Sequence, residues 1–394
     1  MNLLFLTHHR PHLVRFRAGA FAREMAAKGH QVTIVCISEN AKFKPRRLQL
    51  DGVSYLESPD LLPGKMRSGW DPWNTAWRIG AIKKLWDQAD AIHAFETRPT
   101  TIFPILWHQK RNPKPLLIDW NDWWGRGGLI TELRPKWYQR LFGGMETWFE
   151  EHYRHRADIT TLISHGLVDR ALHLHVKHDT IHVITGGADH QHFQAVDSQA
   201  HRPAHDLPAD HLLCCFSALD VTMDAKMAID AFAQASKTSP NLRLMLVMRK
   251  SAQLTQLLKS AGVADKVYQL GIFPYEQLPP VLACADLFLL PFPDKPANRG
   301  RWPNKVMDYL SCGRPVITHP TGEMAKLFAD SAAGVLVEET PEAMAAAMLE
   351  LAADPERRRQ MGQAGRHLAE TTYSWPFLAE RLQNCYDLAM TPHG

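Results

Sequence analysis

Short apolar runs alternate with helical patterns along the chain in two successive rounds. The first round predicts strands at Leu3–Leu6, Gln31–Ile37, Ala91–Ala94, Pro115–Asp119, Thr160–Ile163 and Ile181–Thr185. The second round predicts strands at Leu212–Phe216, Leu242–Val247, Val267–Leu270, Asp286–Leu290, Pro315–Thr318 and Gly334–Val337. Strands that are apolar throughout suit a parallel sheet covered on both faces, and each parallel pair needs a crossover connection. The pattern therefore predicts an α/β protein with two doubly wound, Rossmann-like parallel sheets.

The length of 394 residues exceeds the usual size of one hydrophobic core, which also favours two domains. Residues 190–211 carry several Pro, Asp and His and no periodicity, so we expect a linker there. The domains would then span residues 1–189 and 212–374, with the helix at 375–394 packing back on the first. Ligands of such sheets bind beyond the carboxyl ends of the strands, so we expect a central cleft between the domains.

The segment Asn298–Val316, NRGRWPNKVMDYLSCGRPV, gathers basic groups where a helix is expected to begin. Unpaired N–H groups at a helix start, together with Arg299, Arg301 and Lys305, would attract a phosphate or pyrophosphate. Asp308 lies three residues past Lys305 and so on a similar face of the helix. A carboxylate beside a phosphate site suits a sugar diol, which indicates a nucleoside diphosphate with its ribose.

Positive charge is concentrated in the first half of the chain. Residues 1–185 hold 26 Lys and Arg against 18 Asp and Glu, whereas the rest holds 19 against 23. A basic half favours an anionic partner such as a membrane surface or a lipid-linked phosphate. Its tryptophans beside Lys42–Arg47 and Lys65–Arg67 fit peripheral membrane contact; the alternative is a solvated basic face over buried tryptophans. No nucleic-acid partner is expected, because the charges follow no recognised nucleic-acid motif.

Apolar runs in this chain are far shorter than a membrane-spanning helix requires, and the opening MNLLFLTHHR is expected to form a buried strand. The six cysteines show no CxxC spacing, which favours a reducing cytoplasm. A peripheral position at the inner membrane face is a further hypothesis. The 21 histidines show no pattern that would bring three or four ligands together, so neither a metal nor another cofactor is expected.

Four motifs occur in an order and at distances that resemble a known family. They are HVITGGADHQHF (His182–Phe193), VYQLGIFPYEQLPPVLACADLFLLPF (Val267–Phe292), PNKVMDYLSCGRPVITHPTGE (Pro303–Glu323) and SWPFLAERLQNCY (Ser374–Tyr386). Together they resemble the retaining glycosyltransferases of family 4, which adopt the two-domain GT-B fold. The resemblance covers most of the chain. It implies metal-independent transfer of a hexosyl unit from a nucleotide diphosphate sugar to a hydroxyl of a glycan or lipid-linked acceptor.

The resemblance also implies roles for residues of the second domain, which would hold the donor. Asp308 would accept hydrogen bonds from the ribose, and Lys305 would neutralise the pyrophosphate with Arg301 and the Gly300–Trp302 loop. The ring of Tyr275 would contact the base, and Glu323 would lie near the donor sugar.

Two positions depart from the family pattern. Gly300 stands where the family has the first glutamate of a pair, and Ala218 stands where it has an arginine. Lys226, about three residues late, would serve as the family's lysine. The missing charge would come from Arg249 with Lys250, or from Arg299 and Arg301.

The first domain would hold the acceptor. In LLIDWNDWWGRGG (Leu116–Gly128), Asp119, Asn121 and Asp122 follow or end a strand and would face the cleft. The family often has a histidine in this loop, and Asn121 occupies its place. Asp122 is therefore our candidate for the polar group near the reacting centre; the alternative is that DWND only caps and anchors the loop.

His8, His9 and Glu96 also follow predicted strands and so border the acceptor side, or lie in surface loops. Two other functions are open: a nucleotide-sugar epimerase or hydrolase on the same fold, and a non-catalytic nucleotide-sugar binding module. A requirement for an acceptor separates the transferase from both.

Overall fold

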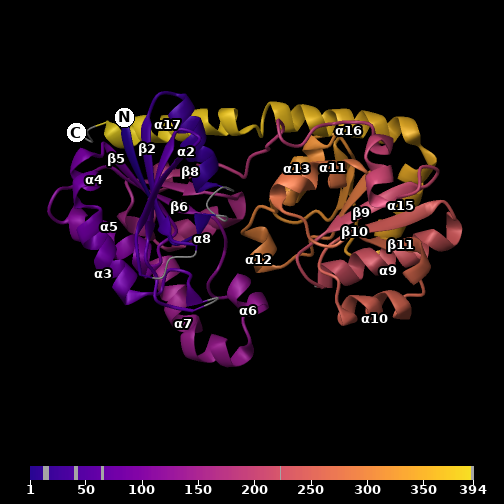
Figure 1. The fold of residues 1–394 in the computed structure, drawn as a ribbon, viewed down its shortest axis with the longest axis horizontal. Coiled ribbons are helices and arrows are strands. Elements are labelled where there is room, and N and C mark those ends of the chain that lie inside the picture. Colours follow the sequence, from indigo (N-terminus) through magenta and orange to yellow (C-terminus); the bar gives the residue numbers. More distant parts are fainter. Residues whose placement is uncertain (12–16, 40–42, 64–65, 222, 392–394) are drawn as a thin grey trace. The chain divides into compact units, whose positions relative to one another are not determined.

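The computed structural model describes residues 1–11, 17–39, 43–63, 66–221 and 223–391. Among the basic residues noted above, Lys42 and Lys65 lie outside these ranges. The chain divides into two compact units (Figure 1). The first unit comprises residues 1–186, 299–302 and 375–394, and the second comprises residues 187–298 and 303–374. Each unit contains one sheet built on parallel strands, which confirms the predicted fold class.

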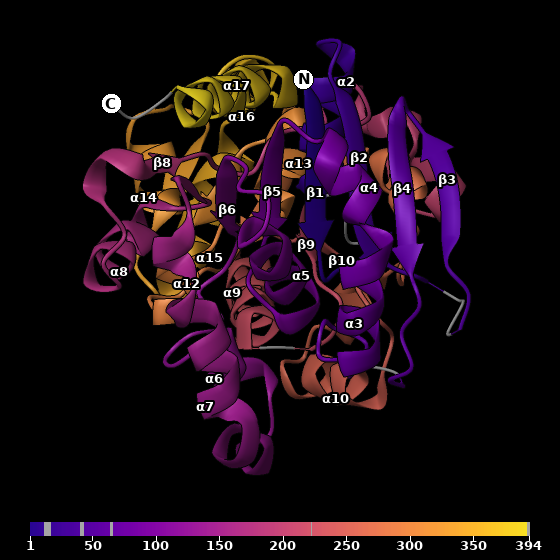
Figure 2. The ribbon, with the colours of Figure 1, turned by 90° about the vertical axis from the view of Figure 1, so that its left-hand side faces the viewer.

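The sheet of the first unit has eight strands in the order β3-β4-β2-β1-β5-β6-β7-β8 (Figure 2). Their bounds are β1 Asn2–Thr7, β2 Gln31–Ile37, β3 Arg46–Leu50, β4 Val53–Ser58, β5 Ala91–Phe95, β6 Leu116–Trp120, β7 Ile159–Leu162 and β8 Ile181–Val183. Neighbouring strands are parallel, except that β3 pairs antiparallel with β4. The parallel order places the ends of β1, β5 and β6 side by side.

The β3–β4 hairpin is absent from the sequence prediction. Four of the five β3 residues are exposed, because β3 lies at the sheet edge, so its sequence RRLQL lacks the apolar run of a central strand. Asp51 and Gly52 form the turn with positive φ angles of 51° and 75°. An Asp-Gly pair is a strong signal for a two-residue hairpin turn, and it could have located both strands.

Helices cover both faces of the first sheet. The α-helices of this unit are α2 Ala18–Ala27, α3 Pro72–Ala81, α4 Lys83–Gln88, α5 Pro99–Gln109, α6 Leu129–Leu133, α7 Lys136–His152, α8 Val168–His173 and α17 Trp375–Met390. One face packs on α2 and α17, and the opposite face packs on α4 and α5 through Trp86, Ile102 and Ile105. Helices α3 and α4 are consecutive and meet at Ile82, which is the C-cap of the first and the N-cap of the second.

The last helix, α17, belongs to the core of the first unit (Figure 1). Its buried face, which includes Leu378, Leu382 and Tyr386, lies in one cluster with Phe5 of β1. The Tyr386 hydroxyl lies 2.7 Å from Nδ1 of His93 in β5, and both residues are fully buried. A buried polar pair that is hydrogen-bonded avoids the cost of desolvation without a partner.

The sheet of the second unit has six parallel strands in the order β11-β10-β9-β12-β13-β14. Their bounds are β9 Leu212–Ser217, β10 Leu242–Val247, β11 Val267–Gln269, β12 Leu287–Leu290, β13 Val316–Thr318 and β14 Gly334–Leu336. The helices are α9 Met223–Thr238, α10 Ala252–Ser260, α11 Leu278–Ala283, α12 Pro296–Arg299, α13 Lys305–Ser311, α14 Glu323–Ala329, α15 Pro341–Ala353 and α16 Pro355–Glu370. Side-chain caps from Ser251, Thr340 and Asp354 begin α10, α15 and α16.

Residues 190–211, which we expected to be a linker, are assigned to the second unit. They include short 3-10 helices at Ser198–Ala200 and Arg202–His205. Arg202 is almost fully buried; it pairs with Asp286 at 2.6 Å and donates to the carbonyl of Cys284. This buried guanidinium anchors the segment, and a loop without periodicity gives no sequence signal for such an anchor.

Each of the six cysteines is buried and unpaired. In the described part of the chain, no helix combines the length and the apolar character needed to cross a membrane.

Candidate functional site

The carboxyl ends of β1, β5 and β6 surround a small polar cavity of about 90 Å³ in the first unit. His8 and His9 follow β1, Glu96 follows β5, and Asn121 and Asp122 follow β6; all five line the cavity. Neighbouring parallel strands end at the same sheet edge, which is why residues far apart in sequence meet here. The structure thus brings together five of the predicted site residues.

Asp122 lies among other carboxylates. Burial, followed by the neighbouring Glu96, raises its pKa to about 7, although Arg301 acts in the opposite direction. The carboxyl of Glu150 in α7 adds to this repulsion, and its own pKa is also raised to about 7, mainly by burial. Two carboxyl groups that titrate near neutrality are able to exchange protons at physiological pH, and such shifts gather at functional sites.

Glu96 organises the loop that carries Asn121. One carboxylate oxygen of Glu96 accepts a 2.7 Å hydrogen bond from the backbone N–H of Asn121, and the other pairs with Arg154 at 2.7 Å. Its own backbone adopts a positive φ of 69°, which costs energy for a residue with a Cβ atom. These contacts make Glu96 a positioning residue for the β6 loop.

Two buried polar atoms of the cavity have no hydrogen-bond partner within the described part of the chain, namely Nδ1 of His8 and Oδ1 of Asn121. Burial, followed by the nearby His9 and Arg98, holds the pKa of His8 well below 6.5, so its ring is neutral. Its ring contacts the His9 ring, with centroids 4.1 Å apart and the two planes tilted by 42°. A bound polar ligand would satisfy both atoms.

Helix α7 supplies the wall that the sequence did not predict. Glu146 accepts hydrogen bonds from Trp124 Nε1 and Tyr138, and Glu150 accepts them from Trp120 Nε1 and the backbone of Trp124 and Gly125. The two glutamates lie one helical turn apart and therefore point the same way. In the sequence, the four-residue spacing of Glu146 and Glu150, in a helix that follows a Trp-rich segment, is the feature from which their place in the site could have been predicted.

Asp119 lies inside the sheet, not at the cavity. Its side chain is fully buried, and its oxygens accept from Arg17 at 2.8 and 2.9 Å and from Thr161 at 2.6 Å. Burial alone raises the pKa of Asp119, but Arg17 outweighs burial and holds that pKa below its usual range. Asp119 therefore fixes Arg17 and the end of β6, and it offers no free oxygen to an acceptor.

The segment Arg299–Trp302 belongs to the first unit, whereas Lys305 belongs to the second. A side chain at Gly300 has no room, because a Cβ atom there would lie 2.5 Å from Cβ of Trp123. This contact explains why glycine replaces the glutamate that the family resemblance leads one to expect. Arg301 lies near enough to Asp122 to stabilise its charged form.

In the second unit, Lys305 begins α13 beside the end of β9. Its Nζ donates a 2.7 Å hydrogen bond to the carbonyl of Ser217 and lies 5.1 Å from the centre of the Phe216 ring. The Ser217 hydroxyl lies 2.6 Å from the hydroxyl of Tyr309, which is buried and stacks on Phe288. The ammonium group is thus held at the carboxyl edge of the sheet, where nucleotide ligands of such folds bind.

Asp308 lies one turn past Lys305 and close to Asp189. Burial, followed by Asp189, raises the pKa of Asp308 to about 7. The hydroxyl of Tyr275 donates to Asp189 at 3.4 Å, and the Tyr275 ring stacks on His192 at 4.9 Å. Asp308 and Tyr275 therefore both lie close to Asp189. Asp189 was not among the site residues predicted from the sequence.

Other predicted donor residues lie in different surroundings. Arg249 pairs with Asp220 at 2.9 Å and is 61% exposed, and Lys226 pairs with Asp230 one turn along α9. Glu323 is the first residue of α14 and is buried. In the described ranges, no three His, Cys, Asp or Glu side chains converge as metal ligands would.

Two protein-family models match the chain, one in each half. The model described as Glycosyltransferase Family 4 matches residues 17–192, and the model described as Glycosyl transferases group 1 matches residues 210–354. The chain is a family 4 glycosyltransferase. This confirms the family resemblance drawn from the four sequence motifs, and the enzyme class that it implied.

Curated relatives of this glycosyltransferase are distant. It is 25% identical over 290 residues to alpha-maltose-1-phosphate synthase of Mycolicibacterium smegmatis, covering 65% of this chain and 70% of the relative. It is 28% identical to D-inositol 3-phosphate glycosyltransferase of Segniliparus rotundus, over 53% of this chain and 47% of the relative. The chain thus spans about half the length of the second relative.

Solved structures show the fold of this glycosyltransferase. Sucrose-phosphate synthase from Thermosynechococcus elongatus superposes with a TM-score of 0.74 at 16% identity, covering 98% of each chain. Anabaena HepE in complex with UDP-glucose superposes with a TM-score of 0.69 at 14% identity, covering 98% of this chain and 99% of that one. The glycosyltransferase therefore has the GT-B fold.

Proposed function

We propose that this glycosyltransferase moves a hexosyl unit from a nucleotide diphosphate sugar to a hydroxyl of a glycan or lipid-linked acceptor, with retention of configuration and without a metal ion. The observation that carries this proposal is the placement of Lys305 and Asp308 at the carboxyl edge of the second sheet. An ammonium group and a carboxyl one turn apart match a pyrophosphate and a ribose diol.

Names of relatives support the substrate classes. One relative is the GDP-mannose-dependent monoacylated alpha-(1-6)-phosphatidylinositol monomannoside mannosyltransferase of Corynebacterium glutamicum, 26% identical over 234 residues. Its name contains a nucleotide sugar donor and a lipid acceptor. By similarity, we assign the second unit to the donor and the polar cavity of the first unit to the acceptor hydroxyl.

In the proposed reaction, the acceptor oxygen forms a bond to the anomeric carbon while the bond from that carbon to the nucleotide phosphate breaks. The acceptor proton passes to the phosphate oxygen that leaves. Negative charge grows on the diphosphate during this step, and Lys305 is placed to stabilise it in advance. This preorganised cation supplies charge stabilisation that a metal ion supplies in other enzymes.

A donor panel tests the proposal. Purified protein is incubated with UDP-, GDP- and ADP-sugars, and binding and release of the nucleoside diphosphate are measured with and without EDTA. We expect one nucleotide series to bind, turnover to depend on an acceptor, EDTA to leave it unchanged, and the product to keep the donor's anomeric configuration by NMR. Release without an acceptor would indicate a hydrolase, interconversion of the sugar an epimerase, and binding without turnover a binding module.

Lys305→Ala tests the role of the ammonium group, with exposed Lys259→Ala of α10 as the matched control. We expect Lys305→Ala to weaken donor binding by about tenfold or more, the scale of a charge-assisted hydrogen bond. The control should bind the donor as the unmodified protein does. Equal donor affinity in both variants would remove Lys305 from the site.

A further inference from the structure

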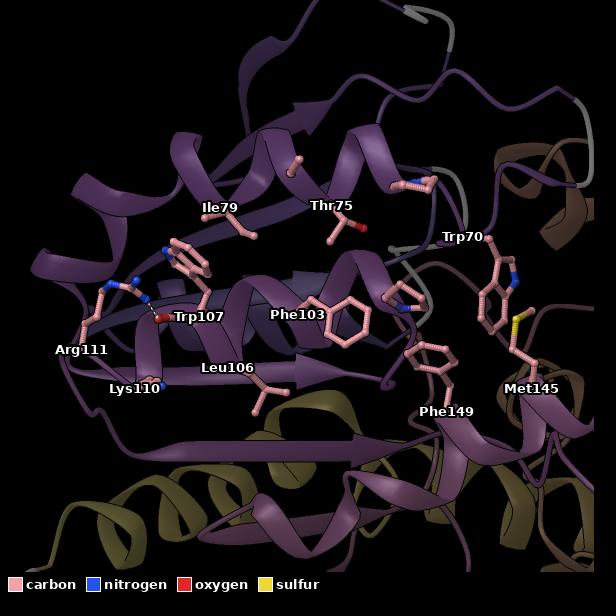
Figure 3. Close-up of a pocket in the computed structure, with 13 residues that line it drawn as sticks. Trp70, Thr75, Ile79, Phe103, Leu106, Trp107, Lys110, Arg111, Met145 and Phe149 are labelled. Carbon is pink, nitrogen blue, oxygen red and sulfur yellow. Dashed lines mark hydrogen bonds between the residues drawn. The ribbon is translucent and has the colours of Figure 1, made fainter.

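A second cavity of about 970 Å³ lies in the first unit between α3, α5 and α7 (Figure 3). This volume is near the upper end of the range of roughly 300–1,000 Å³ typical of ligand pockets. Apolar side chains form most of its wall, among them Ile79, Phe103, Leu106, Trp107, Met145 and Phe149. We call it the apolar groove.

The apolar groove and the polar cavity share their walls. Helix α7 turns Met145 and Phe149 to the groove, and the next residues, Glu146 and Glu150, to the polar cavity. The two cavities also meet at Arg98, which lines the polar cavity while its guanidinium lies 5.3 Å from the centre of the groove's Trp70 ring. A molecule with a polar head and an apolar tail would find both surroundings side by side.

The basic side chains and the indole of Trp70 lie at the two ends of the groove (Figure 3). Trp70 lies at the end beside the polar cavity, and Lys110 and Arg111 lie at the other end (Figure 3). Between them, Thr75 already donates its hydroxyl hydrogen to the backbone of Asp71 at 3.0 Å. The middle of the groove therefore offers few hydrogen-bonding groups to the hydroxyls of a sugar ring, and each hydroxyl buried there without a partner would cost free energy. A hydrocarbon chain has no such requirement.

The basic end is fixed in place by aromatic contact. The Arg111 guanidinium lies 3.9 Å from the centre of the Trp107 ring and donates to the Trp107 carbonyl at 2.9 Å (Figure 3). Trp107 itself is 47% exposed. Exposed tryptophan beside basic side chains suits the boundary between acyl chains and acidic headgroups, where a chain would leave the groove for a bilayer.

We propose that the apolar groove binds the hydrocarbon chain of a membrane-lipid acceptor whose polar head, with the hydroxyl that receives the sugar, lies in the polar cavity. This rests on the proposed function, which assigns the polar cavity to the acceptor. It narrows the acceptor class from glycans or lipids to amphiphiles that carry an apolar chain.

Alkyl glucosides from ethyl to decyl, used below their micelle concentrations, test the groove by calorimetry on the full chain. Each methylene that enters the groove should tighten binding by about fourfold, the transfer free energy of a buried CH₂ expressed as an affinity. Affinities that do not change with chain length overturn the proposal. No donor is present, so the result does not depend on transferase activity.

Leu106→Trp tests the location, because a larger side chain there would fill part of the groove. The matched control is Leu388→Trp, at a half-exposed position of α17 outside the groove. We expect Leu106→Trp to weaken decyl glucoside binding by at least about tenfold and to leave ethyl glucoside unchanged. Equal loss for both glucosides, or equal loss in the control, overturns the location.

Met145→Glu provides a second variant if Leu106→Trp lowers the melting temperature. Met145 is 41% exposed at the groove rim, so its replacement leaves the core intact, and a carboxylate there should oppose an alkyl chain. Donor binding, measured separately, distinguishes the two hypotheses. If glucoside affinity depends on chain length but no nucleotide sugar binds, the groove proposal is supported and the proposed function is wrong. If a nucleotide sugar binds but glucoside affinity does not depend on chain length, the proposed function is supported and the groove proposal is wrong.

Discussion

In the polar cavity of the first unit, the carboxyl groups of Asp122 and Glu150 populate both the protonated and the ionised state near neutral pH. Burial, followed by repulsion from the Glu96 carboxylate, raises the pKa of each to about 7. Among the residues that the structure describes, Nδ1 of His8 and Oδ1 of Asn121 are also buried without a hydrogen-bond partner. A site with such groups is costly to maintain for stability alone, which is typical of residues retained for ligand binding or chemistry.

Asp122→Asn should change how stability depends on pH. The folded pKa of Asp122 is about 7 against an ordinary value of 3.8, so the folded state binds more protons between these values. The free energy of unfolding therefore falls as pH rises from about 4 to about 7, and it stays low above that range. Asn cannot ionise, so we expect the stability advantage of the variant over the unmodified protein to be larger at pH 8 than at pH 5, by on the order of 2 kcal/mol.

Urea unfolding at both pH values measures this difference. Asp179→Asn, at an exposed position, is the matched control and should show the same offset at pH 5 and pH 8. A stability offset of Asp122→Asn that is equal at the two pH values would contradict the raised pKa.

Sequence could predict site residues that directly follow strands. His8, Glu96, Asn121 and Asp122 come after apolar runs, and parallel pairing fixes where those runs end. Glu146 could not be predicted in this way, because it reaches the cavity from a helix whose packing depends on tertiary contacts. Likewise, the reason for Gly300 is a contact with Trp123, which no local pattern records.

At the scale of elements, the predicted strands agree with the structure where burial on both faces demands unbroken apolar sequence. β9 and β10 are examples, since each has four or more buried residues. The edge strand β3 was not predicted, because most of its residues are exposed and an exposed strand does not need an unbroken apolar sequence. The break between α3 and α4 at Ile82 comes two residues after Gly80, a residue that weakens a helix interior.

Leu382→Ala should destabilise the first unit. Leu382 is fully buried in the contact of α17 with β1 and α2, so truncation leaves a cavity. The expected loss is about 2–5 kcal/mol, as for other buried Leu→Ala changes. Leu388→Ala, on the half-exposed face of the same helix, should cost far less. Equal melting temperatures for the two variants, measured by calorimetry, would show that α17 contributes little to the core.

At the scale of the whole molecule, the basic first half should draw the protein to acidic bilayers. The Lys110→Gln/Arg111→Gln double variant should weaken binding to phosphatidylglycerol vesicles by about tenfold or more, since each basic residue near such a surface contributes about 1 kcal/mol. Lys237→Gln/Lys259→Gln, in exposed positions of the second unit, is the matched control. Sedimentation with vesicles at low and high salt gives the measurement. Equal binding to neutral and acidic vesicles would contradict the expectation.

The return of α17 to the first unit has a consequence for synthesis. Residues 187–374 lie between β8 and α17, so the ribosome makes all of the second unit before the first unit can close its core. At ordinary translation rates of about 5–20 residues per second, the apolar face that awaits α17 stays uncovered for roughly 10–40 s. A nascent chain of this protein therefore carries an exposed sheet face while its second unit forms, and that interval is when chaperones would have most to protect.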